Sequence, residues 1–119
     1  MKKIAILGST GSIGNSLIQI IKKDKKNFKI ELITANKNYK KLITQVRFFD
    51  VKNIIITDQN SFLKVKKIFK NEKKNIYNNF DSFETIFKNK KIDYAMCSIT
   101  GFYGLKPTLE IIKFSKVVA

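Results

Sequence analysis

Histidine is absent from this 119-residue chain, and cysteine and proline occur once each. Without histidine, the sequence excludes a histidine general base, a histidine metal ligand and a Ser-His-Asp triad. The single cysteine, Cys97, excludes a disulfide or a cysteine metal cluster within these residues, and it fits a reducing compartment. Its apolar surroundings favour core packing. We therefore predict no catalytic residue and no metal ligand in this chain.

Acidic residues are also scarce, 9 against 24 basic ones, and the formal net charge is +15. Such a charge normally indicates nucleic acid or an anionic membrane surface as the partner. However, every basic residue except Arg47 is lysine, and nucleic-acid binders usually depend on the planar fork of arginine. Lysine, asparagine, isoleucine and phenylalanine are abundant together, which points to a codon bias. We expect neither nucleic acid nor a membrane as the partner.

Long apolar runs are missing as well. The run at residues 4–7 is too short for the core of a signal peptide, and no run approaches membrane-spanning length. The acidic side chains are scattered and are interpreted as solvated or capping groups: Asp58, Asp81, Glu84, Asp93 and Glu110. These absences favour a cytoplasmic protein.

Short apolar runs alternate with stretches of helical periodicity. Strands are expected at 3–7, 28–34, 53–58 and 92–99, with the start of a fifth at 116–119, and helices at 15–23, 40–49, 61–69, 82–87 and from Pro107 toward Ser115. The polar segment 71–81 is either a loop or a short edge strand. The pattern predicts an α/β, Rossmann-like, doubly wound and mainly parallel sheet with helices on both faces. Because the chain stops inside the fifth strand, we expect 1–119 to be one incomplete domain.

The stretch from Gly8 to Gly14, Gly-Ser-Thr-Gly-Ser-Ile-Gly, joins the first expected strand to the first expected helix. In such a turn one glycine permits the tight turn, a second lets the backbone approach a pyrophosphate, and a third lets helix and strand pack closely. The N–H groups at the helix start bind anionic oxygens, and Thr10 and Ser12 add hydroxyl donors. The spacing differs from the commoner Gly-x-Gly-x-x-Gly, and glycines also make ordinary turns. The position at the head of a βαβ unit favours nucleotide binding.

The segment after the second expected strand distinguishes between cofactors. NAD-binding units usually carry an acidic residue there for the ribose 2′-hydroxyl, but no carboxylate lies between Ile33 and Lys41. Lys37 is placed to meet a 2′-phosphate, and Asn38 can donate beside it, although a solvated lysine explains this position equally well. The missing acid favours NADP over NAD.

Three segments together resemble the amino-terminal, NADPH-binding domain of the 1-deoxy-D-xylulose 5-phosphate reductoisomerase family: ILGSTGSIG at 6–14, ANKN at 35–38 and GFYGLKPTLEII at 101–112. The resemblance covers the whole chain. It implies a cofactor site made of Gly8, Thr10, Gly11, Ser12, Ile13, Gly14, Asn36, Lys37 and Asn38. Asn36 stands where the family usually has glycine, and asparagine is the other residue that best tolerates positive φ. Phe102 and Tyr103 depart from the family pattern and receive no role.

The resemblance also implies a reaction for the full-length enzyme. 1-Deoxy-D-xylulose 5-phosphate would be isomerised and reduced by NADPH to 2-C-methyl-D-erythritol 4-phosphate, in non-mevalonate isoprenoid biosynthesis. A divalent metal, Mg²⁺ or Mn²⁺, and a homodimer are implied for that longer protein, and residues 1–119 alone are expected to be inactive. Two alternatives remain open: another NADP-dependent Rossmann reductase, and a basic nucleic-acid-binding module with steeply salt-dependent affinity.

Overall fold

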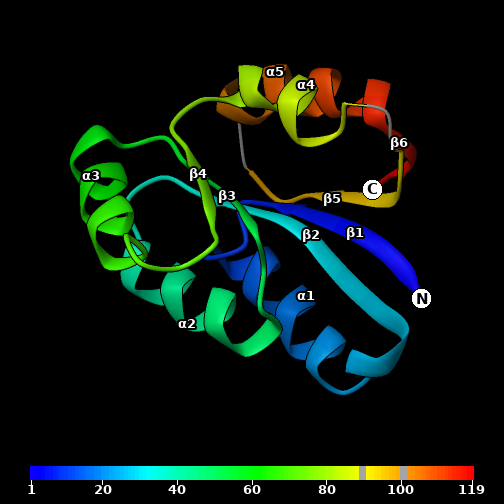
Figure 1. The fold of residues 1–119 in the computed structure, drawn as a ribbon. Helices are drawn as coiled ribbons and strands as arrows, with labels where there is room; N and C mark the ends of the chain where they lie inside the picture. The colour runs from blue at the N-terminus through cyan, green and yellow to red at the C-terminus, as the bar shows by residue number, and fades with distance from the viewer. Residues whose placement is uncertain (89–90, 100–101) are drawn as a thin grey trace.

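The computed structural model describes residues 1–88, 91–99 and 102–119, with side chains in the last range from Lys106 onward. Within these residues, six parallel strands form one sheet in the order β4-β3-β2-β1-β5-β6 (Figure 1). The strands are β1 (Lys2–Leu7), β2 (Phe28–Ala35), β3 (Asn53–Ile56), β4 (Asn75–Tyr77), β5 (Ile92–Cys97) and β6 (Ser115–Val118). The order reverses direction between β1 and β5, which makes the sheet doubly wound.

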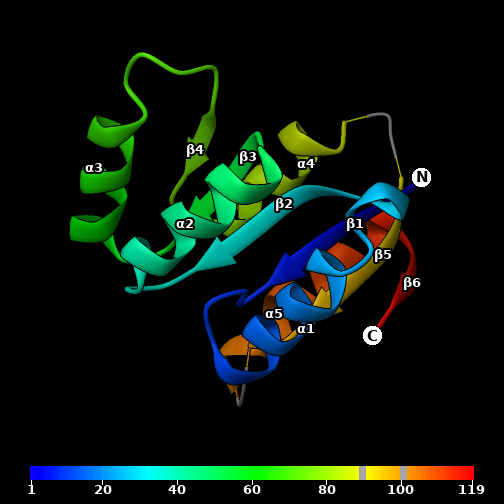
Figure 2. The same ribbon diagram turned by 90° about the horizontal axis from the view of Figure 1, so that it is seen from below.

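Helices cover both faces of the sheet. They are α1 (Ser12–Lys22), α2 (Tyr39–Phe49), α3 (Gln59–Ile68), α4 (Phe83–Ile86) and α5 (Phe102–Ile111), with short 3₁₀ turns at Lys25–Asn27, Phe80–Ser82 and Ile112–Phe114. Helices α1 and α2 lie on one face and α4 and α5 on the other, whereas α3 lies toward the β4 edge (Figures 1 and 2). The predicted α/β fold is confirmed.

Strand β1 supplies both layers of the core. Ile4 and Ile6 pack in the α1/α2 layer, and Ala5 and Leu7 pack in the α4/α5 layer. All four side chains are fully buried, as expected for a parallel strand covered on both faces. Cys97 packs against the α4/α5 layer, which agrees with the expected core packing, and burial raises the pKa of its thiol.

A β-bulge in β2 changes the face to which its side chains point, so that each packs in the same layer as its partner in β1. Ile4 pairs with Ile30 and Ala5 pairs with Leu32, so Glu31 is an extra residue. Side chains along a regular strand alternate between faces, and one inserted residue reverses that alternation. Consequently Ile30 packs in the α1/α2 layer although Leu32, two residues later, packs in the other layer.

The structure decides the alternative left open for 71–81 and changes the expectations for the number of strands, for Pro107 and for the turn at 100–104. The open segment 71–81 contains the short edge strand β4, so the carboxyl-terminal strand is the sixth and not the fifth. Pro107 lies inside α5, not in its first turn, because the helix already begins at Phe102. A proline in a helix interior costs about 3 kcal/mol, and the burial of Pro107 and Ile111 acts in the opposite direction. The glycine-containing turn expected at 100–104 lies outside the described residues at 100–101 and is helical from Phe102.

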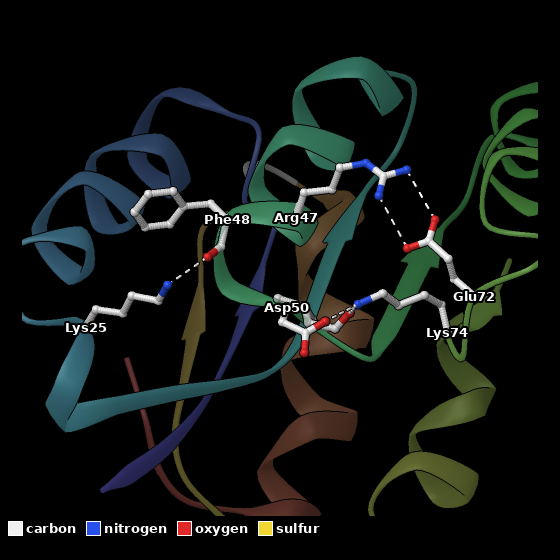
Figure 3. Close-up of polar contacts among 7 residues, drawn as sticks. Lys25, Arg47, Phe48, Asp50, Glu72 and Lys74 are labelled. Atoms are coloured by element: carbon white, nitrogen blue, oxygen red, sulfur yellow. Dashed lines mark hydrogen bonds and ion pairs between the residues drawn. The ribbon is translucent and has the colours of Figure 1, made fainter.

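Polar contacts attach the segment before β4 to the end of α2 (Figure 3). Asp50 follows α2 with φ of 50°, and Lys74 Nζ donates to its Oδ1 at 2.7 Å and to the Val51 carbonyl at 2.9 Å. The Lys74 side chain is only 7% exposed. Arg47 binds both carboxylate oxygens of Glu72, at 3.3 and 3.2 Å. These contacts hold the chain where β4 can pair with β3.

We predict that Asp50→Asn makes the free energy of unfolding depend less on pH in the acid range. The hydrogen bond and charge of Lys74 hold the pKa of the Asp50 carboxyl below its usual value. Stability from a lowered pKa is present above the unfolded pKa of about 3.9 and is lost as the pH falls below it. An asparagine side chain tolerates the left-handed backbone at this position. Urea unfolding should show Asp50→Asn less stable than the parent at about pH 7, with the difference gone near pH 2.

The matched control is Asp81→Asn, which removes another exposed carboxylate. It removes the same charge but leaves the Lys74 contact in place, so a difference between the two variants reports on that contact. Parallel pH curves for Asp50→Asn and the parent would contradict the role assigned to the Lys74 contact.

Candidate functional site

Two of the three motif glycines are required by the packing of the turn after β1. Gly8 has φ of +78°, and a Cβ there would lie 3.0 Å from Ile99 Cγ1 and 3.2 Å from the Ile99 nitrogen. A Cβ on Gly14, in the first turn of α1, would overlap the Gly8 carbonyl oxygen and lie 2.7 Å from Ser9 Cα. Gly8 therefore makes the turn, and Gly14 lets the helix start directly against the strand end.

The middle glycine meets no such restriction. Gly11 is exposed and its φ is −74°, which any residue can adopt. A Cβ there would make only an ordinary contact, 3.6 Å from the Gly8 carbonyl oxygen. The protein's own packing thus does not explain Gly11. A bare backbone at this position leaves room for a ligand to approach the loop.

Helix α1 begins with its positive end uncovered. Gly11 is the residue before its first turn and offers no side-chain cap, and Ser12 and Ile13 in that turn are exposed. The first N–H groups of a helix have no acceptor within the helix, and together with the helix dipole they favour an anion. The turn is therefore suited to phosphate oxygens.

An open cavity of about 600 Å³ lies in front of this turn. Its lining comes from the carboxyl ends of four strands and from one aromatic side chain: Gly8, Thr10, Gly11, Thr34, Ala35, Asn36, Thr57, Phe80, Ser98 and Ile99. The cavity lies where the strand order reverses between β1 and β5. This crevice is the place where open α/β sheets bind ligands.

Asn36 does not use the conformational freedom expected of it. Within the described chain, Asp50 is the one non-glycine residue with positive φ, so the backbone at Asn36 does not require glycine. The Asn36 side chain instead donates from Nδ2 to Thr57 Oγ1 at 2.6 Å. This contact joins the ends of β2 and β3 at the cavity wall.

Lys37 and Asn38 lie at the start of α2, and both are exposed. Asn38 caps the helix, because its Oδ1 accepts from the Lys41 N–H at 3.4 Å. Asp58 caps α3 in the same way and accepts from the N–H and hydroxyl of Ser61, at 3.1 and 2.8 Å. These hydrogen bonds, and then the charge of Lys37, lower the pKa of Asp58. Asp58 is thus a capping carboxylate, as expected from the sequence.

The structure brings part of the predicted site together. Gly8, Thr10, Gly11 and Asn36 line the cavity, and Gly14 is buried beneath the turn. The remaining predicted residues are exposed and are not among the lining residues: Ser12, Ile13, Lys37 and Asn38. The side chains of Phe102 and Tyr103 lie outside the described residues.

Sequence reasoning missed the residues that hold the turn in place. The Gly8 N–H donates to Thr34 Oγ1 at 2.9 Å, and the Ser98 hydroxyl lies 2.9 Å from the Gly8 carbonyl oxygen. Gln45 contacts Ser9 from α2. The available signal was a glutamine within the apolar stripe of α2, at a position where a helix packed on a sheet usually carries a hydrophobic residue.

Within residues 1–88, 91–99 and 102–119, no group of three or more histidine, cysteine or acidic side chains is placed to hold a metal ion. In that same part of the chain, none of the helices has the length and hydropathy needed to cross a membrane.

A doubly wound parallel sheet, a glycine turn after β1 and a cavity at the reversal of strand order define a Rossmann-like domain of the dinucleotide-binding type. The family model for 1-deoxy-D-xylulose 5-phosphate reductoisomerase matches residues 4–119. The chain belongs to that family.

Similar proteins agree with this assignment. A 1-deoxy-D-xylulose 5-phosphate reductoisomerase of Pelagibacter ubique is 68% identical over 120 residues, and one of Clostridium tetani is 37% identical over 121. The chain is covered completely in both, but it spans only 31% and 32% of those proteins. The solved reductoisomerase of Zymomonas mobilis in complex with NADPH is 28% identical, with a TM-score of 0.87 over 99% of this chain and 31% of that one.

We predict that alanine destabilises the fold strongly at the third glycine of the motif, Gly14, and only slightly at the second, Gly11. Gly14→Ala should lower the free energy of unfolding by about 3 kcal/mol or more, because the new Cβ meets rigid backbone. Gly11→Ala, the matched control, should change it by less than about 1 kcal/mol. Urea unfolding measures both. Equal stability of the two variants would contradict the close packing of α1 on the end of β1.

Proposed function

We propose that residues 1–119 are the NADPH-binding portion of a longer 1-deoxy-D-xylulose 5-phosphate reductoisomerase. The whole enzyme would isomerise 1-deoxy-D-xylulose 5-phosphate and reduce it to 2-C-methyl-D-erythritol 4-phosphate. The observation that carries the proposal is the turn from Gly8 to Gly14, which presents the uncovered start of α1 to the cavity where the strand order reverses. Family membership supports the reaction.

The residues present fit NADPH. The backbone N–H groups of Ser12 and Ile13 and the hydroxyl of Thr10 would hold the pyrophosphate. Gly11, whose own N–H donates to the Gly8 carbonyl oxygen at 3.2 Å, would leave room for the phosphates to approach. Asn36, at the end of β2, would face the adenosine side, and Lys37 and Asn38, at the start of α2, would face the 2′-phosphate, while Gly8 and Gly14 shape the turn. When bound, the cofactor supplies the hydride. The reductoisomerase of Zymomonas mobilis was solved with NADPH, which supports this choice.

The preference for NADPH over NADH is assigned to Lys37 and Asn38. Both are exposed after β2, and Asn38 uses its Oδ1 as a helix cap, which leaves the amide Nδ2 available as a donor. The nearby carboxylate of Asp58 already accepts two hydrogen bonds from Ser61. No acidic residue follows β2 at the place where an NAD-binding unit carries one.

In this proposal, metal binding, substrate binding and dimer formation are properties of the longer protein. Related reductoisomerases were solved with magnesium and with fosmidomycin, and we propose that Mg²⁺ or Mn²⁺ is bound by residues outside 1–119. We further propose a homodimer and a cytoplasmic location, which fits a chain with one cysteine. Sedimentation of the natural full-length protein would test the dimer.

Lys37→Gln should weaken NADPH binding about tenfold and leave NADH binding unchanged, because only NADPH carries the 2′-phosphate. Isothermal titration of the full-length protein with each nucleotide measures both affinities. The control is Lys70→Gln, which removes another exposed lysine beyond the end of α3. Equal weakening of both nucleotides by Lys37→Gln would contradict the assignment.

The full-length protein should oxidise NADPH when 1-deoxy-D-xylulose 5-phosphate and Mg²⁺ or Mn²⁺ are supplied, and fosmidomycin should inhibit it. Residues 1–119 alone should show no turnover. Failure of the full-length protein to consume NADPH with this substrate would overturn the proposed reaction. Steeply salt-dependent DNA or RNA binding, together with equal affinity for NADPH and NADH, would favour the nucleic-acid alternative.

A further inference from the structure

Gln45 of α2 contacts the glycine turn at two atoms. Its Nε2 donates to the Ser9 carbonyl oxygen at 2.9 Å, and its Oε1 accepts from the Ser9 hydroxyl at 2.7 Å. Gln45 is 4% exposed and Ser9 is fully buried. A buried amide that uses both its donor and its acceptor on one residue fixes the position of that residue.

Ser9 is held entirely from inside the protein. Besides the two contacts with Gln45, its N–H donates to the Thr34 carbonyl oxygen at 3.0 Å, and its hydroxyl lies 3.5 Å from the same oxygen. The Ser9 hydroxyl therefore points into the core, whereas the neighbouring residues Thr10 and Gly11 line the cavity. The contacts of Ser9 therefore hold in place the next part of the turn, which lines the cavity.

The same helix reaches the other half of the proposed cofactor site. Asn38 caps α2, and Gln45 lies two turns further along it, between the buried residues Leu42 and Val46. Helix α2 thus carries a proposed 2′-phosphate residue at its start and the contact to the pyrophosphate turn in its middle. A rigid helix holds these two ends of the site at a constant separation.

We infer that Gln45 is a positioning residue of the dinucleotide site, which holds the turn at Ser9 so that the N–H groups of the following residues converge on the pyrophosphate. This inference rests on the proposed function. Without the Gln45 amide, the Ser9 carbonyl loses its contact with Nε2, and the Ser9 hydroxyl keeps only the long contact of 3.5 Å to the Thr34 carbonyl oxygen, so the turn shifts to improve its hydrogen bonds. Both NADPH and NADH contain the pyrophosphate, so both lose affinity by the same factor.

The test is Gln45→Met in the full-length protein, because methionine keeps the length and volume of glutamine but forms neither hydrogen bond. Titration should show NADPH and NADH each bound about 5- to 20-fold more weakly, with their ratio unchanged. Lys37→Gln, in contrast, should change the ratio. The matched control is Val46→Ala, which removes core volume from the next residue of α2 and should lower stability while leaving both affinities as in the parent.

The outcomes distinguish failure of the positioning role of Gln45 from failure of the proposed function. Folded Gln45→Met that binds both nucleotides like the parent overturns the positioning role, and so does Val46→Ala weakening them as much as Gln45→Met. Failure of the parent to bind either nucleotide overturns the proposed function itself. If Gln45→Met does not fold, Ser9→Ala removes the hydroxyl contacts and keeps the contact of the Ser9 carbonyl with Gln45. This variant should bind both nucleotides about threefold more weakly; unchanged affinity there also overturns the inference.

Discussion

The close approach of α1 to the end of β1 is the constraint on which the rest of the site depends. Gly14 lies against the Gly8 carbonyl and Ser9 Cα, where no side chain fits, and Gly8 turns the chain through positive φ. Helix and strand are thereby joined by the short turn at residues 8–11 alone. The first N–H groups of α1 consequently emerge at the carboxyl edge of the sheet, beside the ends of the neighbouring strands.

Contacts from the sheet and from α2 hold the same turn in place. The bulge at Glu31 shifts the phase of β2, so that Ile33 and Ala35 pack in the α1/α2 layer while Thr34 between them accepts from the Gly8 N–H. Gln45 then holds Ser9 from the same layer. A buried polar network of this kind orders a backbone only when all its members are satisfied. Across the part of the chain described here, no buried side-chain donor or acceptor is left without a partner.

Much of the fold and part of the site could be predicted from the sequence. The apolar runs located the main strands, and the glycine stretch located the turn, because both signals are local and follow from backbone geometry and burial. The sequence did not decide the state of 71–81, since β4 has only three residues within a polar segment, and the contact of Lys74 with the distant Asp50, which holds the chain before β4, leaves no local signal. Pro107 misled the prediction of the start of α5, because proline fits both a first turn and, at a cost, a helix interior.

The sequence by itself determined that this chain forms a Rossmann-like α/β domain and where the glycine turn after its first strand lies, because strand and helix periods and glycine spacing are properties of consecutive residues. Only the tertiary structure decided which polar residues hold that turn and which line the cavity. Ser9 and Thr10 are adjacent hydroxyl residues in the sequence, yet one is buried against Gln45 and the other lines the cavity. That difference arises from the packing of α2 and β2 against the turn, and contacts between residues 25 to 36 positions apart are not encoded in any local pattern.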